Sequence, residues 1–347
     1  MLLVQLGTPA APTAAALRPY LREFLSDPRV VEIPRLIWWP ILHGIILNTR
    51  PARSAQKYAS VWTPDGSPLM AHSLRQAEGL RRQLAQRGLQ PTVALAMRYG
   101  EPSISGVLRE LRDQGLRRIL VLPLYPQYAG STTATAIDAV TRELNGWRNL
   151  PELRWVRNFH DHPAYIEALA EHVRQAWSRK PPADKLVMSF HGVPRRTLDL
   201  GDPYHCECLV TARLLAERLG LPRERWVVTF QSRFGKAEWL QPYTEPTLVE
   251  LAAAGTRSVD LLCPGFVSDC LETLEEIAIE ARHAFTEAGG EEFNYLGCLN
   301  DGEPFLRALA DLVVEHTAGW PLAPGQGPDE QALQARLQRA RELGAKT

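Results

Sequence analysis

A histidine stands where an apolar run ends in the middle of the chain. Residues 185–192 read Lys-Leu-Val-Met-Ser-Phe-His-Gly, so a β-type segment delivers His191 and is followed at once by a glycine. An imidazole titrates near neutral pH and can take up or release a proton. Ligands of open parallel α/β sheets collect outside the carboxyl ends of the strands, which makes His191 a candidate for chemistry. A histidine that only ends a strand would look the same.

Carboxylates follow a later apolar run. Residues 263–276 read Cys-Pro-Gly-Phe-Val-Ser-Asp-Cys-Leu-Glu-Thr-Leu-Glu-Glu, a turn that passes into a helical pattern. Ser268 or Asp269 is expected as the N-cap, and Glu272 then lies in the first turn, where the helix macrodipole favours its charge. Capping would account for Asp269, but it gives no particular reason for Glu272.

Short apolar runs, each followed by a polar turn and a helical pattern, must position these groups. Amphipathic segments at 73–87, 165–178 and 272–287 lie between the runs, and a chain of 347 residues exceeds the usual size of one core. The alternation predicts an α/β fold of two doubly wound parallel-sheet lobes. We place the lobes at 1–158 and 159–320, and a tail with a charged helix in 321–347. The expected strands are 2–6, 93–97, 118–124, 153–156, 186–190, 227–230, 259–262 and 293–296, and the tail helix is 330–342.

Charge and cysteine content narrow the function classes. Lys plus Arg and Asp plus Glu both number 39, so the formal net charge is zero, which argues against a nucleic-acid partner. Five cysteines, after a start without a basic leader, indicate reduced thiols in the cytoplasm. No stretch reaches the roughly 20 apolar residues that a membrane crossing needs. We expect a cytoplasmic protein with a small or apolar ligand that rests at most on the inner membrane surface.

Residues 30–47 are too apolar for an ordinary connection, and they include Trp38 and Trp39. Exposed apolar patches of this kind mark ligand or membrane contacts. A helix buried between the lobes would have the same composition. We expect an apolar lip at about residues 30–50. The arginines that flank it suit an anionic ligand or lipid headgroups, and they are Arg29, Arg35, Arg50 and Arg53.

Three common motifs are missing from the sequence. No strand is followed by G-x-G-x-x-G, and Gly235-Lys236 lacks the upstream glycine of a Walker loop. Neither a dinucleotide nor a nucleoside triphosphate is therefore supported. The G-x-S-x-G elbow is also absent, which removes the commonest esterase mechanism.

Sequence blocks along nearly the whole chain resemble, in order, those of the ferrochelatase family, whose enzymes insert ferrous iron into a porphyrin. Each block is weak evidence alone, and together they are highly specific. They are Leu6-Gly7-Thr8-Pro9, Tyr58 with Gly66-Ser67-Pro68, Met97-Arg98-Tyr99, Leu122-Pro123-Leu124-Tyr125-Pro126-Gln127-Tyr128 with Ser131-Thr132-Thr133, Ser189-Phe190-His191-Gly192, Gly201-Asp202-Pro203-Tyr204, Phe230-Gln231-Ser232-Arg233-Phe234-Gly235 and Asp269-Cys270-Leu271-Glu272-Thr273-Leu274.

The resemblance implies that His191 and Glu272 are the catalytic pair and meet the metal on opposite sides of a porphyrin cleft between the lobes. Metallation replaces two pyrrole N–H protons with one dication, so it needs a base and an anionic path for the iron. A porphyrin bound in a bent shape exposes its nitrogen lone pairs. The resemblance also implies substrate contacts by Leu6, Met97, Arg98, Tyr125, Trp239, Phe266 and Asp269, with Arg50, Tyr58 and Ser67 near the propionates.

Protoporphyrin IX is the expected porphyrin, ferrous iron is the second substrate, and no further cofactor is expected. Coproporphyrin is less favoured, because enzymes of that type usually have a tyrosine where Leu6 stands. An iron–sulfur cluster is not expected, since the tail from Pro321 contains no cysteine. Cobalt insertion into sirohydrochlorin, which normally uses two active-site histidines, and a non-catalytic tetrapyrrole carrier are the alternatives. We expect a monomer.

Overall fold

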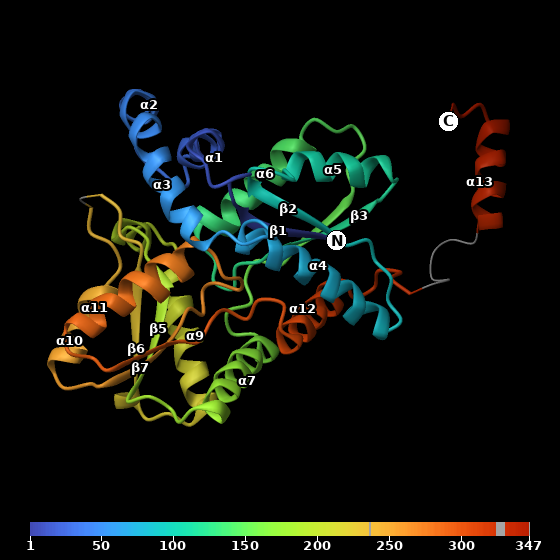
Figure 1. Ribbon diagram of the computed structural model, residues 1–347. Coiled ribbons are helices and arrows are strands. Elements are labelled where there is room, and N and C mark those ends of the chain that lie inside the picture. Colours follow the sequence, from blue (N-terminus) through green and yellow to red (C-terminus); the bar gives the residue numbers. More distant parts are fainter. Residues whose placement is uncertain (236, 324–329, 347) are drawn as a thin grey trace.

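Eight strands form two parallel sheets in a computed structural model, which describes residues 1–235, 237–323 and 330–346. The sheets have strand orders β2-β1-β3-β4 and β6-β5-β7-β8, so the second half repeats the topology of the first. Figure 1 shows the two sheets in separate halves of the molecule. The predicted α/β class and its two parallel-sheet lobes are confirmed. The strands are β1 (Leu2–Gly7), β2 (Ala94–Tyr99), β3 (Arg118–Pro123), β4 (Glu152–Trp155), β5 (Lys185–His191), β6 (Trp226–Gln231), β7 (Ser258–Leu262) and β8 (Glu292–Tyr295).

Helices cover both faces of each sheet, because successive strand side chains point to opposite faces. In β1, Leu2 and Val4 pack in the cluster under α5 and α6, whereas Leu3 joins the cluster under α4. The second sheet has α10 and α11 on one face and α7 and α9 on the other. The bounds are α4 (Pro68–Gln86), α5 (Ile104–Asp113), α6 (Thr135–Leu144), α7 (Pro163–Arg179), α9 (Tyr204–Leu219), α10 (Thr244–Ala253) and α11 (Arg282–Glu287).

The two halves share one continuous core. Helix α12 (Glu303–His316) lies late in the chain, yet it packs against both α4 and α7. A Cβ on Gly79 of α4 would lie 2.4 Å from the Leu306 side chain, so the glycine permits this close approach. The predicted boundary at residue 158 falls in the connection between β4 and α7, and it stays a prediction because α12 returns to the first half.

Four helical elements between β1 and α4 form a projection beside the first sheet, marked by α1, α2 and α3 in Figure 1. Their core is built from leucines and aromatic rings, among them Trp38. Trp38 is only 7% exposed, and its Nε1 donates to Leu25 O at 2.7 Å, whereas Trp39 is 44% exposed. The expectation that both tryptophans mark an exposed lip is therefore wrong for Trp38. The elements are α1 (Ala14–Ser26), α2 (Arg35–Ile41), the π-helix η1 (Leu42–Ile46) and α3 (Leu47–Val61).

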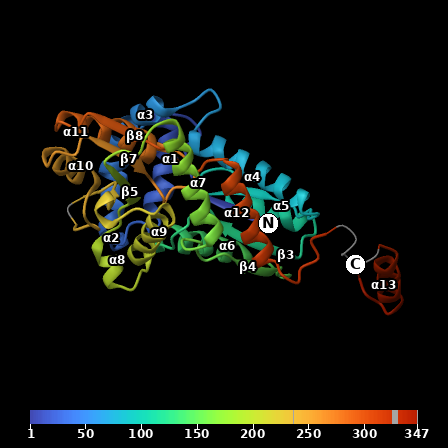
Figure 2. The ribbon, with the colours of Figure 1, turned by 90° about the horizontal axis from the view of Figure 1, so that it is seen from below.

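The remaining elements are the tail helix and the helical segments in the connections between strands. Helix α13 (Glu330–Glu342) has the bounds predicted for the charged tail helix, and it stands apart from both halves in Figures 1 and 2. Residues 324–329 and 347 of the predicted tail, and Lys236 of the Gly-Lys pair, lie outside the described residues. None of the described helices is long and apolar enough to span a membrane. The others are η2 (Gly130–Ala134), α8 (Arg195–Asp199), η3 (Arg223–Arg225) and the π-helix η4 (Glu272–Ala281).

Candidate active site

His191 is the last residue of β5, at the carboxyl end of the second sheet, as its sequence position predicts. It pairs in register with Gln231, the last residue of β6. Its Nδ1 lies 2.5 Å from the carbonyl oxygen of Gly192. A carbonyl only accepts, so Nδ1 carries the proton, and Nε2 of the neutral ring keeps a free lone pair. His191 can therefore act as a base through Nε2.

Two aromatic rings flank the imidazole of His191. The ring centroids of Trp239 and Phe266 lie 6.5 and 6.2 Å from the imidazole, and both rings are tilted by 49° to it. A glycine at position 192 is required here, because a Cβ would lie 2.7 Å from Gln231 O and 3.2 Å from the Trp239 ring. The two predicted pocket aromatics thus surround the predicted base.

Glu272 is the first residue of the π-helix η4, and Gln231 fixes its main chain. Nε2 of Gln231 donates to Glu272 O at 2.9 Å, and Oε1 of Gln231 accepts from Ser189 Oγ at 2.8 Å. Ser189 also lies 2.8 Å from Thr244 Oγ1, within a fully buried polar chain. Gln231 therefore joins the strand that carries His191 to the helix that carries Glu272. Sequence reasoning gave Gln231 no role.

Glu276 adds a second carboxylate to the site, beside His191 and Glu272. Its carboxylate accepts from Ser232 N at 2.6 Å and from Ser232 Oγ at 2.5 Å. Burial raises the pKa of Glu276, and the nearby Glu272 charge raises that pKa further, while His191 acts in the opposite sense. Ser232 has φ +66°, an uncommon value outside glycine that marks a site held by its surroundings. Glu276 was not predicted as a site residue, although it follows Glu272 by four residues, a spacing that places two helical side chains near each other.

Helix α3 of the first half faces Glu272 across the interface between the halves. Burial raises the pKa of Tyr58, and the charge of Glu272 raises it further. Burial lowers the pKa of Arg50, and the charges of Glu272 and Tyr58 act to raise it. The Arg50 guanidinium lies 4.8 Å from the centroid of the Phe234 ring. Ser67 is buried and accepts from Thr8 Oγ1 at 2.8 Å.

The other first-half candidates differ in how open they are. Leu6 is partly buried and packs on the α1–α3 core, whereas Met97 is fully buried in the shared core. Arg98 is buried in an ion pair with Asp27 and also donates to Thr135. Tyr125 is buried, and its hydroxyl has no hydrogen-bond partner among the described residues. The structure thus brings Leu6 toward the α3 side and gives Arg98 a structural ion pair.

Asp269 lies in a network that fixes the start of η4. Its carboxylate accepts from Tyr295 Oη at 2.6 Å, Asn300 Nδ2 at 2.7 Å and Thr273 Oγ1 at 3.0 Å. The helix start has no side-chain cap, so the prediction of Ser268 or Asp269 as N-cap is wrong. The physical reason is that β8 and the loop after it supply stronger partners for the carboxylate. Its predicted contact with substrate stays a prediction.

The cysteines do not form a metal centre in the part of the chain that the structure describes. All five are free thiols, and only Cys206 is exposed. No group of three or more His, Cys, Asp and Glu side chains there is arranged to hold a metal ion. Burial raises the pKa of Cys208, Cys263, Cys270 and Cys298, which favours the protonated thiol. The expected lack of an iron–sulfur cluster stays a prediction.

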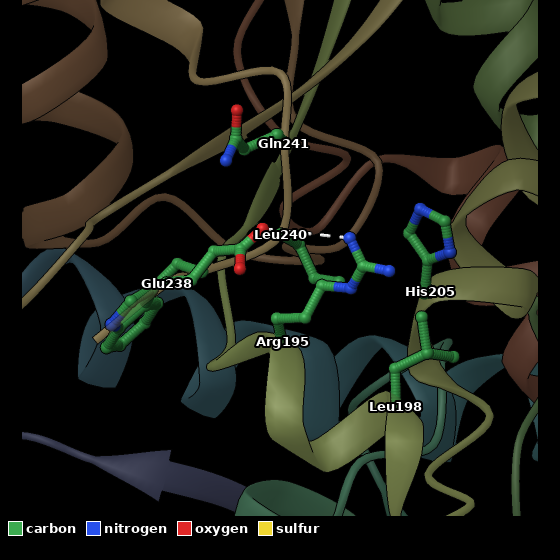
Figure 3. Close-up of a pocket in the computed structure, with 7 residues that line it drawn as sticks. Arg195, Leu198, His205, Glu238, Leu240 and Gln241 are labelled. Atoms are coloured by element: carbon green, nitrogen blue, oxygen red, sulfur yellow. Dashed lines mark ion pairs between the residues drawn. The ribbon is translucent and has the colours of Figure 1, made fainter.

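A pocket of about 350 Å³ adjoins Trp239, on the segment that follows β6. Arg195 and Glu238 lie 3.6 Å apart at this pocket, and Figure 3 shows the Arg195 guanidinium between Glu238 and His205. Burial lowers the pKa of His205, and the Arg195 charge lowers it further. The lining residues are Arg195, Leu198, His205, Glu238, Trp239, Leu240 and Gln241.

The fold and site define a two-lobed α/β protein of the chelatase class, with a base and carboxylates at the edge of one sheet and aromatic rings beside them. The solved structure "SirB from Bacillus subtilis with Fe3+" has the same fold, with a TM-score of 0.53 at 16% identity over 73% of this chain and 92% of that one. The family model for ferrochelatase matches residues 1–317. The chain belongs to the ferrochelatase family.

Curated relatives match nearly the full length of the chain. A ferrochelatase of Aromatoleum aromaticum is 62% identical over 99% of this chain and 94% of its own length. A ferrochelatase of Polaromonas sp. is 60% identical over the same shares of the two chains. These matches confirm the family that the sequence blocks indicate.

Proposed function

We propose that the protein inserts ferrous iron into protoporphyrin IX, with His191 and Glu272 at the reacting centre. The observation that carries the residue assignment is the position of Gln231. Its main chain pairs with His191, and its side-chain amide holds Glu272. One buried side chain thereby ties the end of the strand that carries His191 to the main chain of Glu272, as a reaction that uses both residues at one ring requires.

Metallation exchanges two pyrrole N–H protons for one Fe²⁺, so the charge of the ring does not change. Nε2 of His191 accepts the first proton, because Nδ1 is committed to the Gly192 carbonyl. The carboxylates of Glu272 and Glu276 offer oxygen ligands to the arriving dication, and one of them takes the second proton as the metal enters the ring. Nε2 is then protonated and Nδ1 is held by Gly192, so His191 serves the opposite side of the ring as the proton acceptor and not as a ligand of the iron.

The residues around this centre suit a flat, apolar ring with acidic edges. Trp239 and Phe266 lie beside His191 and offer faces for the macrocycle. Leu6, Met97, Arg98, Tyr125 and Asp269 complete the substrate set by family resemblance. The partly buried Arg50 gains from an anionic partner, because burial disfavours its isolated charge. A propionate carboxylate supplies that partner, with Tyr58 and Ser67 beside it.

The porphyrin is proposed to reach the site from a membrane surface, across α2 and η1. The exposed apolar side chains there include Leu36 at 93% and Ile37 at 59% exposed, with Trp39 nearby. Arg35 and Arg53 suit anionic lipid headgroups. Leu36→Asp with Ile37→Asp should abolish cosedimentation with anionic liposomes, whereas Leu150→Asp, at a leucine 61% exposed just before β4, should not. Unchanged liposome binding by the double variant would refute this role.

We further infer a cytoplasmic monomer that needs no cofactor beyond its iron substrate. The odd number of cysteines, all of them free thiols, supports the cytoplasmic part of this assignment. Sedimentation equilibrium and metal analysis of the protein purified without oxygen test it directly. A dimer, or bound iron and sulfide, would contradict it.

The reaction is tested by anaerobic loss of protoporphyrin fluorescence on addition of ferrous iron. Wild type should metallate the ring catalytically, and His191→Ala should bind the porphyrin but not metallate it. Tight porphyrin binding without turnover by wild type would instead indicate a carrier. Faster turnover of coproporphyrin than of protoporphyrin would overturn the choice of substrate.

A further inference from the structure

Lys57 on α3 links the two halves of the protein. Its Nζ lies 2.8 Å from Glu275 Oε1 and 2.9 Å from Glu280 Oε1, both on η4. The two glutamates are five residues apart, the hydrogen-bond step of a π-helix, and both reach Lys57 on α3. Lys57 is 47% exposed and Glu275 only 12%, so one carboxylate of the pair is largely shielded from water.

The contact joins the two elements that carry opposite sides of the proposed site. Helix α3 packs against η4 and carries Arg50 and Tyr58, and the charge of Glu272 acts to raise the pKa of both. Glu272 and Glu276 are on η4. Lys57 follows Arg50 by seven residues, two turns of an α-helix, and so lies on the same side of α3. The position of η4 against α3 therefore sets the distance of Glu272 and Glu276 from Arg50 and Tyr58.

The halves are fastened differently on their other side. There Gln76 of α4 is fully buried, and its Nε2 donates to Ser268 Oγ at 2.9 Å and to Asn300 O at 2.8 Å. Helix α12 packs on α4 beside these bonds. That side is a buried joint, whereas the contact between α3 and η4 combines the packing of Leu271 on the α1–α3 core with an ion pair that water and salt reach.

We propose that Lys57 is a positioning residue for metal insertion, which holds η4 against α3 and so sets Glu272 relative to the bound porphyrin. This inference rests on the proposed function. The ammonium also lies between two carboxylates that would otherwise repel each other. Lys57 does not touch the reacting atoms, and its effect passes through the helix that carries Glu272.

The test compares Lys57→Met, which keeps the apolar stem and removes the charge, with Lys57→Arg, which keeps the charge. Lys57→Met should lower kcat about five-fold, the scale of a modest ion pair, while the Kd for protoporphyrin changes less than about two-fold. Lys57→Arg should keep kcat within about two-fold. Raising salt should lower the wild-type kcat toward that of Lys57→Met, because exposed pairs are screened, and should leave the variant unchanged.

Lys180 provides a matched control, because it is 51% exposed and pairs with Glu292 inside the second half. Lys180→Met should keep the wild-type kcat and its salt dependence. If Lys57→Met fails to fold, Glu280→Gln replaces it, since Glu280 is half exposed and its loss also weakens the contact. A wild-type kcat in a folded Lys57→Met, or an equal loss in Lys180→Met, would overturn the proposal.

A second readout separates this proposal from the proposed reaction. Amide hydrogen exchange of residues 272–281 should speed up in Lys57→Met and not in Lys180→Met, whether or not metal is present. If wild type does not metallate a porphyrin, the proposed reaction is refuted. Faster exchange in Lys57→Met would still uphold the contact between α3 and η4. Unchanged exchange in Lys57→Met would refute the contact as a positioning device.

Discussion

Replacement of Gln231 by leucine tests the central geometry of the site. The change removes the bonds from Gln231 Nε2 to Glu272 O and from Ser189 Oγ to Gln231 Oε1. Each lost bond is worth about 1 kcal/mol, and Ser189 keeps its contact with Thr244, so the free energy of unfolding should fall by about 2 kcal/mol. Leucine has a similar size, so little cavity is added.

The expected loss of activity is much larger than the loss of stability. Glu272 loses the group that fixes its main chain, and a shift of about 1 Å at a reacting group can cost about 100-fold in rate. We expect kcat for metallation of Gln231→Leu to fall by about that factor, while the Kd for protoporphyrin changes little. Anaerobic fluorescence assays measure both quantities, and urea unfolding measures the stability.

Ser189→Ala is the matched control for Gln231→Leu. It removes the bonds of the Ser189 hydroxyl to Gln231 Oε1 and to Thr244 Oγ1, but it leaves the bond from Gln231 Nε2 to Glu272 O. Its free energy of unfolding should fall by about 2 kcal/mol, as in Gln231→Leu, and its kcat by less than about five-fold. A Gln231→Leu protein that is destabilised as expected but keeps the wild-type kcat would show that Gln231 does not position Glu272 for the reaction.

Two further predictions concern buried contacts. Asp27→Asn should destabilise the protein by about 3–5 kcal/mol in urea unfolding at pH 7, because it leaves the buried Arg98 without its carboxylate partner. Burial acts to raise the pKa of Asp27, but Thr135, Arg98 and Tyr99 lower it below its ordinary value. The stability from this carboxylate is therefore present above the unfolded pKa of about 4 and is lost as pH falls through the folded pKa, and the variant should lack this loss. Gly192→Ala should lower both the melting temperature and kcat, since its Cβ would lie 2.7 Å from Gln231 O, and a fully active, equally stable variant would show that the strand end adjusts freely.

The fold could be predicted from the sequence because strand burial leaves a local pattern. Every expected apolar run is a strand within two residues of its predicted ends. The catalytic candidates were also local: His191 ends an apolar run, and family resemblance pointed to Glu272. Gln231 was missed because its role depends on a bond to a residue about forty positions away, which leaves no periodic pattern, whereas the four-residue step from Glu272 to Glu276 was a local signal that was not used.

Trp38 and Asp269 show where local patterns fail. The segment around Trp38 contains Pro40 and passes into a π-helix, so its side chains do not follow one helical period and the buried tryptophan cannot be told from the exposed one. Asp269 has the sequence context of a helix cap, yet Tyr295 and Asn300 reach it from later elements. In both cases tertiary contacts outweigh the local preference.

The proposed reaction divides between the two halves of the molecule. The second half supplies the base and carboxylates at the ends of β5 and β6 and on η4, and these are fixed to one another by Gln231. The first half supplies α3, which packs against η4 and whose Arg50 and Tyr58 have pKa values that the Glu272 charge acts to raise. Changes within the second half should therefore alter the chemistry itself, whereas changes at Lys57 should alter only how well two intact halves of the site meet. Combining Gln231→Leu with Lys57→Met separates these effects: if both act only by displacing Glu272, the double variant should lose less than the product of the single losses in kcat.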